Sequence, residues 1–438
     1  MPKNIVICCD GTGNEIGVTI SNVLKLFRIA EKSGRQRVWY NAGVGTIGQQ
    51  NPWTRWLQKV RGVFGLATGL GLDDDVLAAY RYLCSTYREG DRVFLFGFSR
   101  GAYTVRALAA FVHVMGIFRI DQLNIAGYAW TAFKRASAKD RSRATPSQPR
   151  SGVANSQPLS PLEEAWHFSR VIGGKPITIE FIGVWDTVAS VIVPRFEQLS
   201  LSLQTLRFTR TNPSVKTLRQ AIAIDEKRRM FRLNAWAQPQ TFRPNPFNRK
   251  SDAAQDIKQV WFAGVHGDVG GGYPEVESGL SKYPLAWMVE EAAAAGFRIN
   301  RAMINHLVYG KPRAGSTHSY QPPDFRAELH RSLTTWWWPL EIFPKLKKWR
   351  EWPQGRPAFL GLYIPFAEPR PIPGGARIHQ SACDRRAAQV GYDPANWPGA
   401  FTAEPNSPAP AKPRARPRTS KTAGKSADPT RSGYNDPA

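Results

Sequence analysis

Short apolar runs alternate with longer helical stretches from Asn4 to about residue 300. Apolar runs predict strands at 5–9, 37–40, 92–96, 177–184 and 260–265, and the intervening pattern predicts helices at 21–32, 73–87, 102–114 and 284–295. Such regular alternation predicts a mostly parallel sheet with helices on both faces, because parallel strands need crossover connections. The fold class expected is therefore α/β, with an α/β-hydrolase-like sheet.

Composition divides the chain into a catalytic domain and a tail. Residues 1–400 are expected to form the domain, because a hydrophobic fraction of 42% supports a sizeable core. Within it, the Ser-, Arg- and Pro-rich segment 136–161 predicts an exposed loop, and 195–258 predicts a helical and irregular segment that could cap a site. Residues 401–438 have few apolar side chains and predict a disordered basic tail.

The segment 91–112 carries the strongest chemical signal. A short apolar strand leads into Gly97-Phe-Ser-Arg-Gly101, and an apolar helix follows. A serine between two such glycines, at a sharp turn from strand to helix, is typical of the nucleophile elbow of serine hydrolases. The same glycines could instead serve a plain βα turn with a solvated serine. The strand before and the helix after favour Ser99 as a nucleophile.

A serine nucleophile needs a histidine base and a carboxylate that orients it. His266 leaves the end of an apolar strand and enters a glycine-rich turn, and Asp186 leaves the end of another strand. Both positions suit a site at the carboxyl edge of a parallel sheet. Asp268 is the alternative acid, although a residue so close to His266 more readily bonds its own loop.

The first strand ends in Asp10-Gly-Thr-Gly-Asn14. Backbone N–H groups of Gly11 or Thr12, together with that of Arg100, are candidates for an oxyanion hole. Asp10 is a secondary candidate, because a strand followed by Asp-Gly-Thr also resembles the haloacid-dehalogenase pattern. That pattern requires an aspartate two positions earlier, where this chain has Cys8. Asp10 could also simply cap backbone amides of the turn.

Several of these motifs occur together, in order, in one known family. They are Cys9–Asn14, Gly43–Thr46, Gly97–Tyr103 with Arg106, Gly183–Val188 and His266–Tyr273. The chain resembles the α/β-hydrolase family, catalogued as a domain of unknown function, that includes the catalytic domains of type VI secretion phospholipase effectors. The resemblance implies a triad of Ser99, Asp186 and His266 and hydrolysis of acyl esters, with phospholipids the expected substrates. Gly267 stands where the family commonly has serine, which leaves substrate preference open.

The net charge of the chain indicates which kind of surface it contacts. Lys and Arg number 59 against 34 Asp and Glu, and this excess of +25 favours anionic surfaces. A lipid surface is preferred to nucleic acid, because no nucleic-acid-binding signature is present. Trp336, Trp337 and Trp338 precede a run of Lys and Arg and are candidates for membrane contact. Tryptophan clusters also form ordinary cores.

The sequence shows no signal peptide and no apolar run of spanning length, so we expect synthesis in the cytoplasm, with export by a signal-independent system left open. The four cysteines show no metal-binding spacing, and neither a metal nor an organic cofactor is expected. The resemblance leaves an immunity protein or a secretion-system protein open as a partner.

Taken together, the sequence predicts a serine carboxyl-ester hydrolase, with a phospholipase or lipase as the preferred function. The alternatives are an esterase or thioesterase for small soluble substrates, which would use the same triad, and a non-catalytic surface-binding protein.

Overall fold

A computed structural model of the chain describes the protein in ten stretches. They are residues 1–11, 19–43, 71–142, 161–188, 192–195, 200–203, 206–245, 248–346, 359–388 and 391–407. Residues 1–407 belong to one compact unit. Its centre is a sheet of eight strands, and each pairing described within that sheet is parallel.

The strands follow the order of the chain across this sheet, except that the first strand lies between the second and the third. Across the sheet they are β14 (Phe401–Glu404), β13 (Ala376–His379), β10 (Asp256–Phe262), β7 (Val215–Ala223), β4 (Ile179–Trp185), β3 (Arg92–Phe98), β1 (Asn4–Cys9) and β2 (Gln36–Asn41). The chain therefore starts near one edge and crosses to the other. Because the strands are parallel, the carboxyl ends of β3, β4 and β10 lie at a common edge of the sheet.

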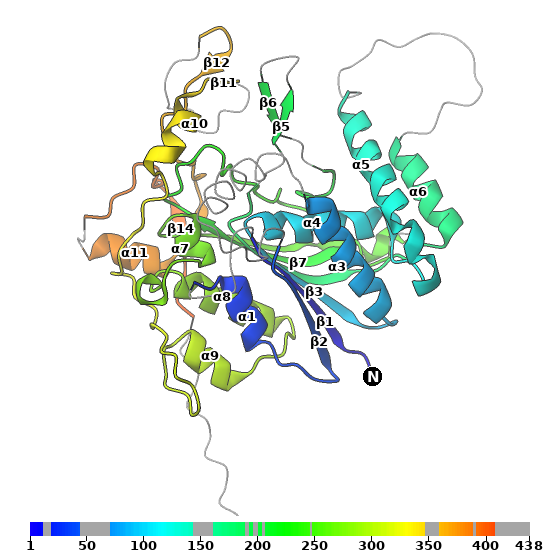
Figure 1. Cartoon of the computed structure of the whole chain (residues 1–438), viewed down its shortest axis with the longest axis horizontal. Coiled ribbons are helices and arrows are strands. Elements are labelled where there is room, and N and C mark those ends of the chain that lie inside the picture. Colours follow the sequence, from blue (N-terminus) through cyan, green and yellow to red (C-terminus); the bar gives the residue numbers. More distant parts are fainter. Residues whose placement is uncertain are drawn as a thin grey trace, which may run out of the picture. The chain divides into compact units, whose positions relative to one another are not determined.

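Strand β1 shows why helices cover both faces. Ile5, Ile7 and Cys9 join one core, whereas Val6 and Cys8 join the other, as the two-residue period of a strand requires. The first core includes side chains of α3 (Leu72–Thr86), α4 (Arg100–Met115), α5 (Ala126–Ser142) and α6 (Pro161–Ile172). The second includes side chains of α1 (Asn22–Ile29), α8 (Lys282–Ala294) and α9 (Arg301–Leu307). Figure 1 shows these two groups on either side of the sheet. The predicted fold class is confirmed.

Smaller elements complete the unit. The helical ones are η1 (Ile120–Ile125), η3 (Arg249–Ser251), α7 (His266–Gly270), η4 (Glu275–Glu277), η5 (Thr335–Trp337), α10 (Trp338–Ile342) and α11 (Gln380–Ala387). The antiparallel pairs are β5 (Ile192–Arg195) with β6 (Ser200–Leu203), β8 (Thr241–Phe242) with β9 (Ala253–Ala254), and β11 (Lys345–Leu346) with β12 (Leu362–Tyr363). Among the described helices, none combines the length and apolarity needed to cross a membrane.

The expected cap at 195–258 is wrong in its centre, because β7 runs through it as an interior strand of the main sheet. The sequence did not predict β7 as a strand because the strand contains polar residues. Arg219 is buried and pairs with Asp256 and Glu291, and Gln220 accepts a hydrogen bond from Arg106. Buried polar side chains are tolerated where such partners satisfy them, but they remove the apolar run by which a central strand is recognised.

Two other boundaries also differ from the sequence-based expectation. The expected loop 136–161 begins inside helix α5, which continues to Ser142, and ends at the first residue of α6; residues 143–160 lie outside the described part. Residues 401–404, assigned to the tail, form β14 and pair with β13 in the sheet. The remainder of the expected tail, from 408, lies outside the described residues.

Candidate active site

Ser99 occupies a turn that only its neighbouring glycines permit. It lies between β3 and α4 with φ 56° and ψ −120°, a conformation that costs a non-glycine residue energy. A Cβ atom on Gly97 would lie 2.5 Å from the carbonyl oxygen of Gly101, and one on Gly101 would lie 2.1 Å from that of Cys9. Strand, turn and helix thus approach closely, and the serine projects from a strained elbow.

Asp186 and His266 meet at the same edge of the sheet. Asp186 follows β4 with φ 36°, and His266 begins α7 after β10. The Oδ2 atom of Asp186 lies 2.5 Å from Nδ1 of His266, and both side chains are buried. Asp186 is thus the carboxylate that contacts the imidazole of His266.

Two aromatic rings hold the imidazole of His266. Its centroid lies 4.6 Å from that of Phe98 and 4.9 Å from that of Phe231. Because Phe98 immediately precedes Ser99, this contact places His266 beside the elbow. Phe98 in turn fills the space next to Gly270, where a Cβ atom would lie 1.8 Å from the phenyl ring. The glycine-rich turn after His266 therefore serves packing against the elbow.

Arg370 also contacts Asp186, and no motif in the sequence indicated this contact. Its Nη1 donates to Oδ1 at 2.6 Å and its Nη2 to Oδ2 at 3.1 Å, while the backbone N–H of Ala223 donates to Oδ1 at 3.0 Å. Burial alone would raise the pKa of Asp186, but the charge of Arg370 and the hydrogen bond with His266 hold that pKa far below its usual range. Asp186 is therefore an ionised carboxylate.

A second buried carboxylate lies against the backbone of His266. Glu226 accepts the His266 N–H through Oε2 at 3.2 Å and forms two hydrogen bonds of 2.9 Å with the guanidinium of Arg228. Burial opposes ionisation of Glu226, but the charge of Arg228 holds its pKa below the usual value. Spacing along the chain did not single out Glu226.

Asp268 has a different histidine as its partner. Its Oδ1 lies 2.6 Å from Nδ1 of His330, and its Oδ2 accepts the backbone N–H of Val265 at 3.0 Å. The ring of His330 stacks on Tyr273 with centroids 3.5 Å apart. Asp268 thus bonds its own turn, as expected, and also fixes a segment that lies about sixty residues further along the chain.

The end of β1 contacts the elbow, but its first amide is already engaged. A Cβ atom on Gly11 would lie 3.2 Å from Cβ of Ser99, whereas the Gly11 N–H donates to Oδ1 of Asp10 at 2.7 Å. The Oδ2 atom of Asp10 accepts hydrogen bonds from Ser21 and, at 2.8 Å, from Tyr40. Asp10 therefore caps the turn, and the expected Thr12 lies outside the described residues.

Arg100 provides the first residue of α4, directly after Ser99. A helix start directs backbone N–H groups outward and carries a partial positive charge. Its side chain points elsewhere, because Nη2 lies 3.9 Å from Oδ2 of Asp75. The backbone of Arg100, at the start of α4, directly adjoins Ser99.

The three tryptophans of the sequence do not share one environment. Trp337 packs on Phe231, with centroids 5.5 Å apart, and the guanidinium of Arg228 lies 5.0 Å from its ring. Trp338 is 37% exposed, and the side chain of Trp336 lies outside the described part. Trp337 is thereby connected to His266 through Phe231, while Trp338 faces outward.

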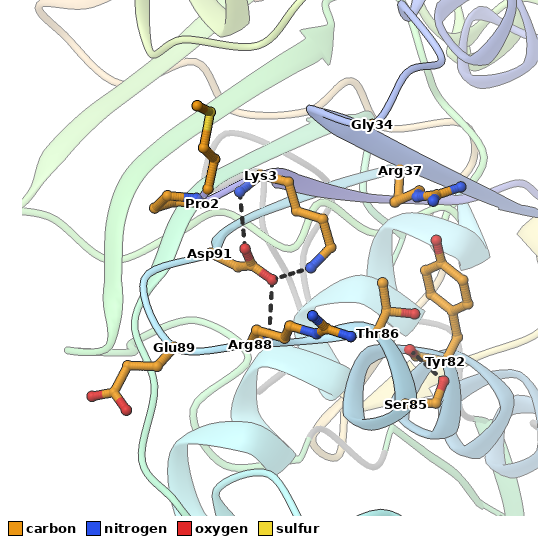
Figure 2. Close-up of a pocket in the computed structure, with 11 residues that line it drawn as sticks. Pro2, Lys3, Gly34, Arg37, Tyr82, Ser85, Thr86, Arg88, Glu89 and Asp91 are labelled. Atoms are coloured by element: carbon orange, nitrogen blue, oxygen red, sulfur yellow. Dashed lines mark hydrogen bonds and ion pairs between the residues drawn. The ribbon is translucent and has the colours of Figure 1, made fainter.

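A wide pocket of about 720 Å³ lies at the opposite edge of the sheet (Figure 2). Its wall includes Lys3 and Asp91, which immediately precede β1 and β3, and Gly34, which lies two residues before β2. Lys3 donates to Asp91 through both its backbone N–H and its ammonium group, as Figure 2 shows. Because ligands of such sheets bind beyond the carboxyl ends of the strands, this pocket is not the candidate active site.

Within the described stretches, no group of three or more His, Cys, Asp or Glu side chains is arranged to hold a metal ion. The described cysteines at positions 8, 9, 84 and 383 are free thiols.

Comparison with known proteins identifies the family. Residues 3–291 match the family model of the catalytic domain of the Tle1-like phospholipase effector of the type VI secretion system. The chain belongs to this family. The match contains Ser99, Asp186 and His266 and ends before His330 and Arg370.

Similar individual proteins give less detail. An uncharacterized protein of Saccharomyces cerevisiae is 27% identical over 241 residues, which is 52% of this chain and 32% of the yeast protein. Among solved structures, an uncharacterized protein from Pseudomonas aeruginosa is 19% identical with a TM-score of 0.35, covering 68% of this chain and 46% of that one. The Tle1 effector bound to the VgrG spike is 20% identical with a TM-score of 0.29, covering 64% and 52%. The Tle1-like chain thus spans about a third of the yeast protein and about half of each solved chain.

Proposed function

We propose that the protein is a serine carboxyl-ester hydrolase that cleaves acyl esters of phospholipids through Ser99, His266 and Asp186. The observation that carries the proposal is the buried contact of 2.5 Å between Asp186 Oδ2 and His266 Nδ1, formed beside a strained serine elbow. Nucleophile, base and orienting acid are the parts that acyl transfer requires. The Tle1-like family model supports phospholipids as the substrate class.

In the proposed reaction, Nε2 of His266 accepts the proton of Ser99 as Oγ attacks the ester carbonyl carbon. The carbonyl oxygen becomes an oxyanion, which the backbone N–H of Arg100 at the start of α4 stabilises. Collapse of this intermediate breaks the ester bond, and His266 returns the proton to the leaving alcohol oxygen. Water then hydrolyses the acyl-enzyme by the same steps, which releases the fatty acid and restores Ser99.

Asp186 assists these reaction steps by fixing the tautomer of His266. An ionised carboxylate at Nδ1 keeps the proton on that nitrogen, which leaves Nε2 as the acceptor that faces away from Asp186. The low pKa of Asp186 keeps it ionised throughout the physiological range. Its burial makes the interaction stronger than it would be in water.

An exposed apolar surface lies close to this site, and we propose that it contacts the lipid surface. We call it the apolar patch; it consists of Trp338, Ile342, Phe343, Phe359, Leu360, Leu362 and Phe366, each more than a third exposed. It extends over α10, β11 and β12, which Figure 1 shows together at one end of the unit. Trp337 connects α10 to Phe231 and so to His266. Exposed apolar surface of this kind marks interaction sites, and Trp suits a head-group boundary.

Family membership also supports delivery by a type VI secretion system, a route that does not need a signal peptide. A protein bound at the secretion spike and an immunity protein in the producing cell are the partners that this proposal implies. Co-purification with a spike protein encoded nearby would support it, and secretion unchanged in a strain without the system would contradict it.

The test of the proposed activity is Ser99→Ala on two substrates, phospholipid vesicles and a soluble short-chain ester. We expect loss of released fatty acid by roughly a thousandfold or more, as for other members of such a triad. Ser85→Ala is the matched control, because Ser85 is an exposed serine at the end of α3, bonded to Tyr82. A fluorophosphonate probe should label the wild type and the control but not Ser99→Ala.

The alternatives give different results in the same experiment. Activity on the soluble ester with none on vesicles would point to a small-molecule esterase or thioesterase. Absence of both labelling and hydrolysis in the wild type would point to a non-catalytic binding protein. A Ser99→Ala variant that kept a tenth of wild-type turnover would overturn the assignment of the nucleophile.

A further inference from the structure

We propose that Arg370 is a positioning residue of this site, which holds Asp186 and Phe231 so that His266 is oriented toward Ser99. The inference rests on the proposed function and deepens it. Arg370 lies 79 residues beyond the end of the family match, in a segment whose local sequence carries no motif. Its role is therefore visible only from its contacts.

The first contact fixes the carboxylate. The guanidinium binds both oxygens of Asp186, at 2.6 and 3.1 Å, and both side chains are buried. A bidentate pair of this kind restricts rotation of the carboxylate in a way that a single hydrogen bond cannot. Because Oδ2 is the atom that meets Nδ1 of His266, Arg370 determines the direction in which that hydrogen bond points.

The second contact fixes the backbone of Phe231, whose ring lies against the imidazole. The Nη2 atom of Arg370 donates to the carbonyl oxygen of Phe231 at 2.5 Å, and Nη1 donates to that of Ala223 at 3.3 Å. The side chain of Phe231 packs edge-on against His266. One guanidinium therefore holds both the carboxylate at Nδ1 and the backbone of the residue whose ring packs against the imidazole.

The backbone of Arg370 is itself anchored. The side-chain amide of Asn396 donates to the carbonyl oxygen of Arg370 at 2.9 Å and to that of Ile224 at 3.0 Å. Ile224 directly follows β7, so the segment that carries Arg370 is tied to the carboxyl edge of the sheet. A residue held at both ends in this way has the rigidity that positioning requires.

Arg370 also belongs to a balanced set of charges around His266. Asp186 and Glu226 contribute two carboxylates, and Arg370 and Arg228 contribute two guanidiniums. The positive charge of Arg370 offsets the attraction of Asp186 for a proton on His266. Removal of that charge should make the imidazole more basic, which a purely structural role would not do.

The experiment compares Arg370→Met, Arg370→Lys and Arg385→Met in the full chain, with a soluble short-chain ester. Arg385 is the matched control: it is a buried arginine whose Nη1 donates to the carbonyl oxygens of Phe325 and Ala327, at 2.6 and 2.7 Å. The measurements are kcat and KM across pH and the melting temperature. Ser99→Ala is assayed alongside, so that failure of the proposed function is seen separately.

We expect Arg370→Met to lower kcat by roughly a hundredfold with KM little changed, because the base is misplaced. The acidic limb of the pH profile of kcat for this variant should move to higher pH by roughly one pH unit. Arg370→Lys should keep the acidic limb in place, because the positive charge remains. It should recover only part of kcat, because the bidentate geometry is lost. If Arg370→Met does not fold, Arg370→Lys still tests the geometry.

The proposal is overturned if Arg370→Lys and Arg370→Met retain wild-type kcat and pH profile. It is also overturned if Arg385→Met shifts the acidic limb as much as Arg370→Met does, since the loss of any buried arginine would then produce the shift. Activity that survives Ser99→Ala would instead contradict the proposed function itself.

Discussion

The carboxylate of Asp268 holds His330, at 2.6 Å from Oδ1 to Nδ1, although Asp268 lies only two residues after His266 in the chain. His266 takes its carboxylate from Asp186, which is eighty residues away in sequence. The two histidines thus belong to two separate acid–histidine pairs at the same edge of the sheet. Proximity in sequence would have paired them wrongly.

The two aspartates should therefore respond differently to neutralisation. Asp186→Asn should lower kcat by roughly ten-thousandfold, as the corresponding change does in a serine protease triad, because the histidine loses its correct tautomer. Asp268→Asn should lower the melting temperature and leave kcat within about tenfold, because it loosens a turn. Steady-state kinetics on a soluble ester with parallel thermal melting separates the two. The opposite ranking would give the orienting role to Asp268.

His330 should make stability depend on pH. The hydrogen bond with Asp268, with a further contribution from Glu277, raises the pKa of His330 from 6.5 to about 8. A folded-state pKa above the unfolded one gives stabilisation that is complete below pH 6.5 and is lost as pH rises through 8. We expect the melting temperature of the wild type to fall between pH 6.5 and 8.5 relative to that of His330→Gln.

The comparison with His330→Gln is needed because another group acts in the opposite direction. Burial lowers the pKa of Lys282 to about 7, and such a group adds stability as pH rises above that value. Both proteins retain Lys282, so the difference between their curves reports His330. Parallel curves would show that His330 does not titrate in this range.

Gly101→Ala should be strongly destabilising. The added Cβ atom would lie 2.1 Å from the carbonyl oxygen of Cys9, which is backbone and cannot rotate away. Helix α4 must then move from β1, and we expect a loss of about 1 to 3 kcal/mol in unfolding free energy, with reduced activity because Ser99 moves. Gly127→Ala in α5 is the control, since no atom lies within 4 Å of its added Cβ. Equal stability of the two variants would contradict the close packing at the elbow.

The apolar patch should matter on vesicles only. Changing Trp338 and Phe343 to Ala together should reduce hydrolysis of anionic phospholipid vesicles and spare a soluble ester, because both side chains are exposed. Trp337→Ala should instead lower activity on both substrates, since Trp337 packs on Phe231 next to His266. Vesicle sedimentation at increasing salt measures the part contributed by the chain's positive charge.

Tyr128→Ala provides a control for that experiment, because Tyr128 is an exposed aromatic residue on α5, outside the apolar patch. An equal loss on vesicles and on the soluble ester for the double variant would show that the patch is structural. The membrane contact would then have to be abandoned.

The sequence by itself determined the parts of the protein that are encoded locally. Five apolar runs became β1, β2, β3, β4 and β10. Ser99, Asp186 and His266 could be singled out because each lies at the end of such a run, next to glycines or on a tight turn. Strand ends in a parallel sheet converge, so position relative to a strand is enough to nominate candidates.

Only the tertiary structure decided which charges surround His266. Arg370 and Glu226 lie in segments without periodicity, and their partners are far away in sequence, so no local pattern distinguishes them from solvated side chains. Strand β7 was missed for the same reason. Its Arg219 and Gln220 are residue types typical of a surface, and only the structure shows their buried partners. Pairing between distant polar groups depends on the folded arrangement, because burial becomes tolerable only when the partner is present.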